Sequence, residues 1–353
     1  MKPKSAIADL LVQEIPGFSL ESSELSFEEL GVDSFAMLEL RAAVEHAIGA
    51  AVPDDVWVQL ESPARLLSHC GETAPRAASG RADVDVRREY ALNMPQMALG
   101  GLSESWLFKE LGDAHWSMIT AGLGAPSSAL RDGNGERLYA TFTRLRIEAS
   151  APLATFEEND EVVLEGRISR FGAGMFFSEM VLAGANRRVT ASIMSSFTKR
   201  GSPSSNTGLL KGQPSIPPDC RIPDLSAMPD FGKGYRERRN GTLSPAQFET
   251  NYDIVPYHDI NGVGLLYFAA YPTISDICEL KYMGRGNQWA LDASTVSRDV
   301  FYLANSDAHE RLKYRVHAKK ETPGGIEIES SISRGSDGAL MAYLVTKKVV
   351  AGA

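Results

Sequence analysis

The sequence predicts an α+β fold, in which a small helical domain precedes two copies of a unit that runs from one helix into antiparallel strands. Three observations support this prediction. Residues 1–72 carry 13 acidic and 4 basic residues, a net charge of −9, whereas the rest of the 353-residue chain is balanced. Segments of similar pattern begin at Pro95 and Pro256. Apolar residues alternate along the stretches that follow each segment, which is typical of strands.

The helical domain is predicted to span residues 1–72 and to contain four helices. The first helix covers residues 5–15, and the second begins at Ser34, with Phe35, Leu38, Ala42 and Ile48 at near-helical spacing. The segment Pro53-Asp54-Asp55 follows, and the last helix opens at Ser62-Pro63. Because Ser34 stands at a helix N-terminus, we expect unpaired backbone N–H groups there to meet a phosphodiester on its hydroxyl.

Residues 4–72 resemble an acyl carrier protein, in which the serine of Gly31-Val32-Asp33-Ser34 carries 4′-phosphopantetheine. The resemblance implies that cofactor on Ser34, a phosphopantetheinyl transferase as partner, and delivery to a polyketide synthase or other carrier-dependent enzymes. The alternative is that Ser34 only caps its helix. The acidic domain would steer encounters with basic patches on proteins, and it argues against nucleic acid or an anionic membrane as a partner.

The remaining chain divides into four predicted segments. Residues 73–88 are rich in Ala, Gly, Pro and charge and are predicted to be a linker; residues 201–242 are predicted to be an irregular connection. The two repeats would occupy residues 89–200 and 243–353. Their predicted helices cover residues 103–120 and 263–277. Their predicted strands cover residues 138–147, 161–170, 175–182 and 188–198, and then 300–303, 310–317, 326–333 and 340–349.

A helix followed by an antiparallel sheet, formed twice, fits a double hot-dog. The stretch 97–116, with Leu138-Tyr139-Ala140-Thr141-Phe142, resembles the leinamycin-pathway bifunctional acyltransferase/decarboxylase family. The resemblance implies an enzyme that converts methylmalonyl-CoA to propionyl-S-carrier protein through an acyl-tyrosine intermediate, with Tyr139 as the nucleophile. The sequence departs from the family at Gly101-Leu102-Ser103, where the compared member has Gly-His-Ser.

The chemistry of this reaction suggests further site residues. A phenol has a pKa of about 10, so a nucleophilic Tyr139 needs a nearby base, cation or oriented donor. Decarboxylation needs N–H donors for an enolate oxygen, and Gly100, Gly101 and Leu102 are candidates, although the glycines could simply turn the chain. His115, in the first helix with Asp113 and Trp116, is a further candidate for the substrate site, although a histidine packed at the surface is the favoured alternative. The alternative for Tyr139 is a strand tyrosine that only packs.

Competing functions remain open. His258 and Gly262 form the His-x-x-x-Gly of polyketide dehydratases, in which the histidine is the catalytic base, but the proline expected five residues later is Tyr267. The alternatives for His258 are a residue that binds substrate and a structural residue. A thioesterase acting on carrier-bound polyketide intermediates, or a non-catalytic carrier and docking protein, are further alternatives.

The sequence also carries expected absences. The cysteines Cys70, Cys220 and Cys278 are scattered, so we expect neither disulfides nor a metal site, and no glycine-rich motif predicts a nucleotide redox cofactor. No apolar run approaches a membrane span and no signal peptide is evident, so we expect a cytoplasmic protein. A homodimer is compatible with the sequence, which leaves the preferred acyl-CoA open.

Overall fold

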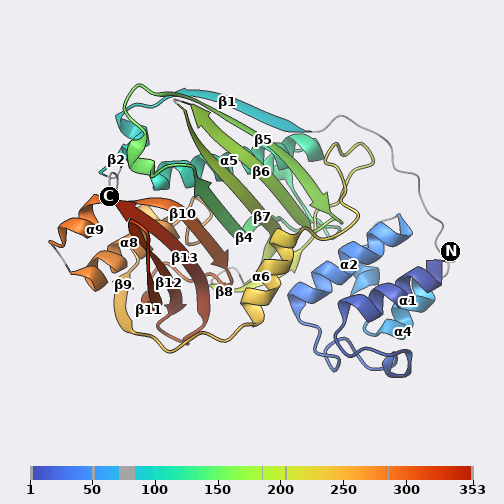
Figure 1. The fold of residues 1–353 in the computed structure, drawn as a ribbon. Coiled ribbons are helices and arrows are strands. Elements are labelled where there is room, and N and C mark those ends of the chain that lie inside the picture. Colours follow the sequence, from blue (N-terminus) through green and yellow to red (C-terminus); the bar gives the residue numbers. More distant parts are fainter. Residues whose placement is uncertain are drawn as a thin grey trace.

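The computed structural model describes residues 3–49, 52–70, 84–99, 101–184, 186–202, 205–284 and 286–350 (Figure 1). The predicted linker lies largely outside the described residues, as does Gly100. The N-terminal part is helical, and the rest combines long strands with two long helices, so the fold is a mixed one of the kind expected.

The N-terminal helices are α1 (Pro3–Glu14), α2 (Ser34–Ile48), α3 (Asp54–Trp57) and α4 (Pro63–Cys70), with a short 3₁₀ turn, η1, at Leu20–Ser22. Apolar faces of α1, α2 and α4 meet in a core of their own, which includes Ile7, Leu40, Val44 and Leu66. Helix α2 ends at Gly49, whose φ of +68° closes the helix in the left-handed conformation that glycine adopts readily.

The long strands form one antiparallel sheet in the order β1-β5-β6-β7-β4-β10-β13-β12-β11-β9, with β8 paired to β7. In the first half, the strands are β1 (Asp85–Ala91), β4 (Tyr139–Ala149), β5 (Glu161–Phe171), β6 (Met175–Gly184), β7 (Arg187–Ser202) and β8 (Ser205–Gly212). In the second half, they are β9 (Phe248–Asp253), β10 (Ala293–Tyr302), β11 (Arg311–Thr322), β12 (Gly325–Arg334) and β13 (Leu340–Val350).

The two halves have matching topology on either side of the β4–β10 pairing, where Val300 is opposite Leu145. Each half contributes one long helix, α5 (Glu104–Leu123) or α8 (Ala270–Met283). Helix α5 packs against β1, β5 and β6, helix α8 packs against β9, and the two helices contact each other. Buried side chains of both helices and both halves of the sheet therefore join in a single core.

Short elements connect these parts. The 3₁₀ turns are η2 (Met94–Gln96), η3 (Ser127–Ala129) and η4 (Leu153–Thr155), the short strands are β2 (Met97–Ala98) and β3 (Gly101–Leu102), and the short helices are α7 (Pro256–Asp259) and α9 (Gln288–Asp292). Ser103 caps α5 by accepting a hydrogen bond from the Trp106 backbone N–H at 3.3 Å.

Two segments that were expected to be irregular are in fact ordered. Strand β1 begins within the predicted linker and pairs with β5 along its whole length. The predicted connection 201–242 contains β8 and the helix α6 (Asp230–Asn240). Glycine explains part of this, because a Cβ at Gly234 would lie 2.6 Å from Nη1 of Arg144, whose guanidinium donates to the Phe231 carbonyl at 2.7 Å. Glycine at this position therefore leaves room for the Arg144 guanidinium beside helix α6.

Helix α6 also lies between the sheet and α2 (Figure 1). Phe35, Leu38 and Ala42 of α2 share one apolar cluster with residues of the sheet and α6, namely Phe171, Met175, Phe177, Met194, Tyr235, Phe301 and Tyr343. Phe35 is only 1% exposed. The N-terminal helices thus pack against the rest of the chain through α2.

Candidate functional site

A cavity of about 510 Å³ lies beside β4, and we call it the Tyr139 cavity. Its wall combines the middle of α5, the first residues of β4, parts of β7 and β8, and the loop 261–268 that precedes α8. Tyr139, the first residue of β4, is half-buried in this wall. The cavity therefore lies where the two halves of the sheet and both long helices come together.

Positive charge surrounds the ring of Tyr139. The guanidinium carbons of Arg137 and Arg200 lie 5.1 and 5.9 Å from the ring centroid. Among the described residues, the Tyr139 hydroxyl has no hydrogen-bond partner, so it is available to a ligand. Opposite Tyr139 on β7 is Thr198, whose hydroxyl lies 2.7 Å from that of Thr141 and which also lines the cavity.

The deeper wall of the cavity is aromatic. Trp116, Phe142, Tyr267 and Phe268 contribute to it, and the Phe142 and Phe268 rings lie 4.0 Å apart between centroids. A Cβ at Gly112 would lie 2.2 Å from Cζ of Phe268, so glycine on α5 makes room for this ring. An apolar acyl chain would find a suitable surface here.

Asparagines fix the loops of the opposite wall. The side-chain oxygen of Asn261 accepts hydrogen bonds from the backbone N–H groups of Val263 and Leu265 at 3.1 and 3.0 Å. Asn305 accepts from the Leu266 N–H at 3.0 Å. The loop is therefore held in place by hydrogen bonds within the chain, which favours a preformed binding site.

Two cations, Lys211 of β8 and Arg239 of α6, line the same cavity. Both lie over the ring of Phe35, at 5.0 and 5.9 Å from its centroid. Burial lowers the pKa of Lys211 to about 8, and the charge of Arg239 acts in the same direction. Among the described residues, Lys211 forms no ion pair within 4.0 Å. The part of the cavity next to α2 is therefore positively charged and poorly neutralised.

Ser34 is the first residue of α2, as predicted, but the helix N-terminus is already capped. The Asp33 carboxylate accepts hydrogen bonds from the backbone N–H groups of Phe35 and Ala36, both at 2.8 Å. The expectation that these N–H groups would be unpaired and meet a phosphodiester is therefore wrong. The cations near this end of the helix are Lys211 and Arg239, which lie over the ring of Phe35, the next residue in the chain.

His115 lies in the core rather than in the lining of the cavity. It is 0% exposed, and its ring nitrogens lie 2.5 Å from the Ser178 hydroxyl and 2.7 Å from the Ser195 hydroxyl. Burial lowers the pKa of His115 to about 3, so the ring is neutral. His115 therefore connects α5 to β6 and β7 through hydrogen bonds with Ser178 and Ser195.

Gly101 and Leu102 also lie away from Tyr139. They form β3, and a Cβ at Gly101 would lie 2.3 Å from the Leu153 carbonyl oxygen, which explains why a glycine with φ +89° stands there. Leu102 lines a second, smaller cavity of about 320 Å³, bounded by α8, α9 and β10. Tyr139 and the predicted Gly101-Leu102 donors are therefore not brought together.

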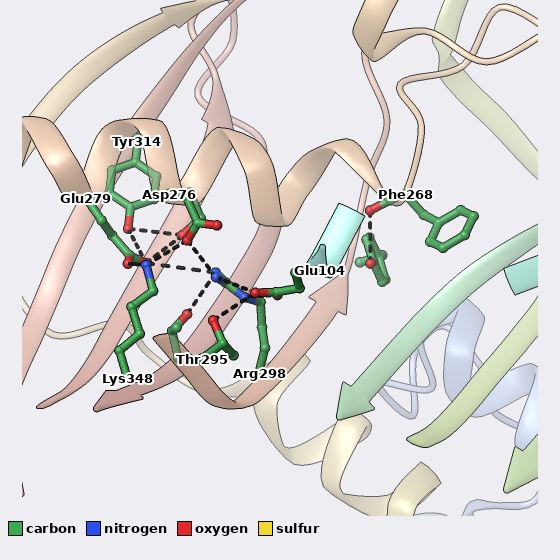
Figure 2. A network of polar contacts seen from close by, with 11 residues as sticks. Glu104, Phe268, Asp276, Glu279, Thr295, Arg298, Tyr314 and Lys348 are labelled. Atoms are coloured by element: carbon green, nitrogen blue, oxygen red, sulfur yellow. Dashed lines mark hydrogen bonds and ion pairs between the residues drawn. The ribbon is translucent and has the colours of Figure 1, made fainter. Parts of the chain in front are cut away.

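A buried ionic network borders this second cavity (Figure 2). Arg298, which is 0% exposed, is paired with Glu104 and lies 2.6 Å from Asp276. Lys348 lies 2.7 Å from both Asp276 and Glu279. Although burial opposes it, the charges of Asp276 and Glu279 raise the pKa of Lys348, which stays protonated. The network joins α5, α8, β10 and β13, and sequence spacing gave no sign of it.

His258 stands at the end of α7, and its side chain is 57% exposed. Its Nδ1 lies 2.7 Å from Oδ1 of the fully buried Asp259, whose other oxygen accepts from the Tyr252 hydroxyl and the Val255 N–H. In the part of the chain that the structure describes, the lining of the Tyr139 cavity includes no histidine and one acidic residue, Asp113.

Two further findings concern the described residues only. No group of three or more His, Cys, Asp or Glu side chains among them could hold a metal ion. None of the helices seen there combines the length and apolar character needed to cross a membrane.

Comparison with known proteins identifies the N-terminal domain. Residues 7–70 match the family described as a phosphopantetheine attachment site. The actinorhodin polyketide synthase acyl carrier protein of Streptomyces coelicolor is 41% identical over 44 residues, which are 12% of this chain and 51% of that protein. This chain thus spans about half the length of the curated relative it matches. The predicted acyl carrier domain and its covalent 4′-phosphopantetheine are confirmed; Ser34 as the attachment residue stays a prediction.

Solved structures identify the fold of the remaining chain. The 12:0-ACP thioesterase of Umbellularia californica aligns with a TM-score of 0.52 and 11% identity, covering 77% of this chain and 100% of that one. A candidate oleoyl thioesterase of Lactobacillus plantarum gives 0.54 and 11%, covering 76% and 97%. An acyl-ACP thioesterase of Bacteroides thetaiotaomicron gives 0.50 and 12%, covering 75% and 97%. The chain therefore joins an acyl carrier domain to a thioesterase-like hot-dog fold.

Proposed function

We propose that this protein is a carrier-fused acyltransferase/decarboxylase that converts methylmalonyl-CoA to a propionyl thioester through an acyl ester on Tyr139. Each half of the sheet, with its long helix, would be one hot-dog unit of a double hot-dog, and the reaction would use the Tyr139 cavity between them. The observation that carries the proposal is a free tyrosine hydroxyl in a cavity with cationic walls, beside the carrier helix α2.

The first step forms the ester. The Tyr139 oxygen attacks the thioester carbonyl carbon, the C–S bond breaks, and the sulfur leaves with the electron pair and takes up the phenol proton, so that CoA is released as a thiol. Arg137 and Arg200, beside the tyrosine ring, would stabilise negative charge that develops on the phenol oxygen.

The second step removes carbon dioxide. The bond between the α-carbon and the carboxylate breaks, and its electron pair forms the enolate of the tyrosyl ester; a proton from solvent at the α-carbon then gives the propionyl ester. An apolar wall excludes water from the carboxylate and so favours its loss. Trp116, Phe142 and Phe268 would supply this wall. The 4′-phosphopantetheine, when attached, supplies the terminal thiol to which the propionyl group is transferred.

The composition of the cavity supports this reaction over the dehydratase alternative. Abstraction of an α-proton requires a base, usually histidine, within hydrogen-bond reach of the substrate. The described lining offers no histidine, and His258 is exposed and paired with Asp259. Asp113, the acidic residue of the lining, lies 2.8 Å from Arg88. A cationic wall also suits an acyl group that carries a carboxylate.

Thioester hydrolysis is the second candidate, and the fold shared with acyl-ACP thioesterases favours it. It would take the same substrate class to a free acid instead of a carrier thioester. In this case, Tyr139 would bind the thioester without forming an ester, and water would be the nucleophile. The non-catalytic alternative, a carrier with a docking domain, predicts neither product.

The deciding experiment is intact-mass analysis of the full-length holo-protein after incubation with methylmalonyl-CoA. We expect a propionyl adduct on the phosphopantetheine arm, together with released carbon dioxide. The Ser34→Ala variant should lack both the arm and its adduct, while a Tyr139-linked adduct accumulates. Free methylmalonic or propionic acid without any adduct would favour hydrolysis, and an unchanged substrate would contradict both enzymatic proposals.

A further inference from the structure

We propose that Lys211 and Arg239 form the binding site for the phosphodiester of the 4′-phosphopantetheine on Ser34, so that the arm enters the Tyr139 cavity of its own chain. The acyl carrier domain would then deliver its arm to the cavity of the same polypeptide chain. This inference uses the same cavity as the proposed function, but it does not depend on the reaction at Tyr139.

The first argument is the way in which α2 is held. Arg236 of α6 lies 3.2 Å from the Glu39 carboxylate and 3.8 Å from that of Glu14, and it donates to the Glu14 carbonyl at 3.3 Å. Together with the apolar cluster around Phe35 and Leu38, these contacts fix both the position and the direction of α2. Its first residue is thereby held at the end of the helix that faces Lys211 and Arg239.

The second argument is that the two cations lack a sufficient counter-charge. Burial acts to raise the pKa of Asp33. The hydrogen bond from the Ala36 N–H and the charges of Arg239 and Lys211 outweigh burial, so the pKa of Asp33 is lowered. Asp33, however, already accepts two backbone hydrogen bonds of α2. Asp33 is shared between the lysine and the arginine, and Glu39, whose charge also acts on Lys211, is already paired with Arg236. Positive charge therefore remains, and a phosphodiester at Ser34 would neutralise it.

The third argument is continuity with the cavity. Lys211 and Arg239 line the Tyr139 cavity and also lie over the Phe35 ring, one residue from the attachment point. A group bound to these two cations would therefore lie next to α2 and at the wall of the Tyr139 cavity. Intramolecular attachment makes docking independent of protein concentration, as expected for two parts of one chain.

The test uses the full-length holo-protein and compares wild type with the double variant K211Q/R239Q. One readout is the ³¹P resonance of the phosphodiester, which should move toward that of free CoA's phosphodiester in the variant. The other is the rate at which iodoacetamide alkylates the arm thiol, followed by mass spectrometry of the ejected phosphopantetheine. Loss of two charge-assisted contacts should speed alkylation by about tenfold or more.

Matched variants control for charge and folding. K320Q/R188Q removes one lysine and one arginine from exposed positions and should leave both readouts unchanged. K211R/R239K keeps both charges and should restore slow alkylation, which a double variant that merely failed to fold would not explain. Tyr139→Phe should also keep slow alkylation, so loss of chemistry and loss of docking are distinguishable.

Two results would overturn the inference. If K211Q/R239Q retains the ³¹P shift and the slow alkylation of wild type, these side chains do not hold the phosphodiester. If the protection of the thiol falls on dilution of the holo-protein, the arm docks into a second molecule rather than its own chain.

Discussion

The ring of Phe35, one residue after Ser34, lies 4.7 Å from the ring of Tyr235 on α6, centroid to centroid. Tyr235 in turn donates a hydrogen bond to the Tyr302 carbonyl of β10 at 2.9 Å, and it lines the Tyr139 cavity. A direct line of contacts therefore leads from the start of the carrier helix to the wall of the candidate site. Helix α6 is the element that makes this connection.

Tyr139→Phe should reduce acyl transfer from methylmalonyl-CoA by at least about 10³-fold, because it removes the nucleophilic oxygen and keeps the ring. Single-turnover kinetics with mass detection of the arm would measure this. Tyr282→Phe is the matched control, because the Tyr282 ring packs at a tilt against Phe248 and is outside the described cavity lining. Transfer at the wild-type rate by a folded Tyr139→Phe protein would rule out the tyrosyl ester.

His258→Ala should leave propionyl transfer within about twofold of wild type, since His258 is exposed and outside the described cavity lining. A 3-hydroxyacyl group loaded on the arm should keep its mass in both proteins. A loss of water from that group in wild type, absent in His258→Ala, would instead support the dehydratase alternative. Intact-mass measurement distinguishes the two results.

Arg298→Met should lower the free energy of unfolding by about 3–5 kcal/mol, because it leaves the buried carboxylate of Glu104 without its ion-pair partner, whereas Asp276 keeps Lys348. Addition of Glu104→Gln should recover part of the loss, since the uncompensated buried charge is then removed. The exposed Arg311 offers a control, as Arg311→Gln should change stability by less than about 1 kcal/mol. Urea unfolding monitored by circular dichroism would measure all three. Equal effects of Arg298→Met and Arg311→Gln would contradict the role assigned to burial.

Glu39 should make the docking of α2 depend on pH. Burial raises the pKa of Glu39 to about 7, although Arg236 opposes the shift. The folded state therefore binds this proton more tightly than the unfolded chain does, so the stability that Glu39 contributes falls as pH rises from about 4.5 through about 7. Glu39→Gln mimics the protonated form. Its free energy of unfolding, relative to that of wild type, should therefore rise by up to about 3 kcal/mol across this pH interval. A constant stability difference between pH 4.5 and 8 would show that folding does not raise the pKa of Glu39.

The strongly patterned parts of the fold were predictable from the sequence. Three examples are the helix that begins at Ser34 and the strands of residues 161–170 and 326–333. The spacing of apolar residues in each segment fits one type of secondary structure, and each element is present close to its predicted bounds. The boundaries between the predicted segments stay proposals. Tyr139 could be singled out because a resemblance pointed to it, and its free hydroxyl in a cavity supports that choice without testing it.

Other features depend on tertiary context. Strand β1 has charged residues at alternate positions, so its composition resembles a linker, yet its pairing with β5 and ion pairs such as Arg87–Glu165 stabilise it. Helix α6 contains two glycines and several charges, which disfavour a helix, and it forms because Gly234 admits Arg144 and Tyr235 packs into the apolar cluster. The sequence favours a packed surface histidine at position 115 over a site residue, and only the fold reveals that His115 is fully buried between two serine hydroxyls.

The apolar face of α2 also sets the order of events during synthesis. Phe35 and Leu38 are translated long before their partners Tyr235, Phe301 and Tyr343. At about 5–20 residues per second, the ribosome needs roughly 15–60 s to reach the last of them. During that time, the folded carrier must expose this face, where another protein, such as the enzyme that attaches its cofactor, could engage it. The nascent chain therefore exposes this apolar face until the rest of the protein folds over α2.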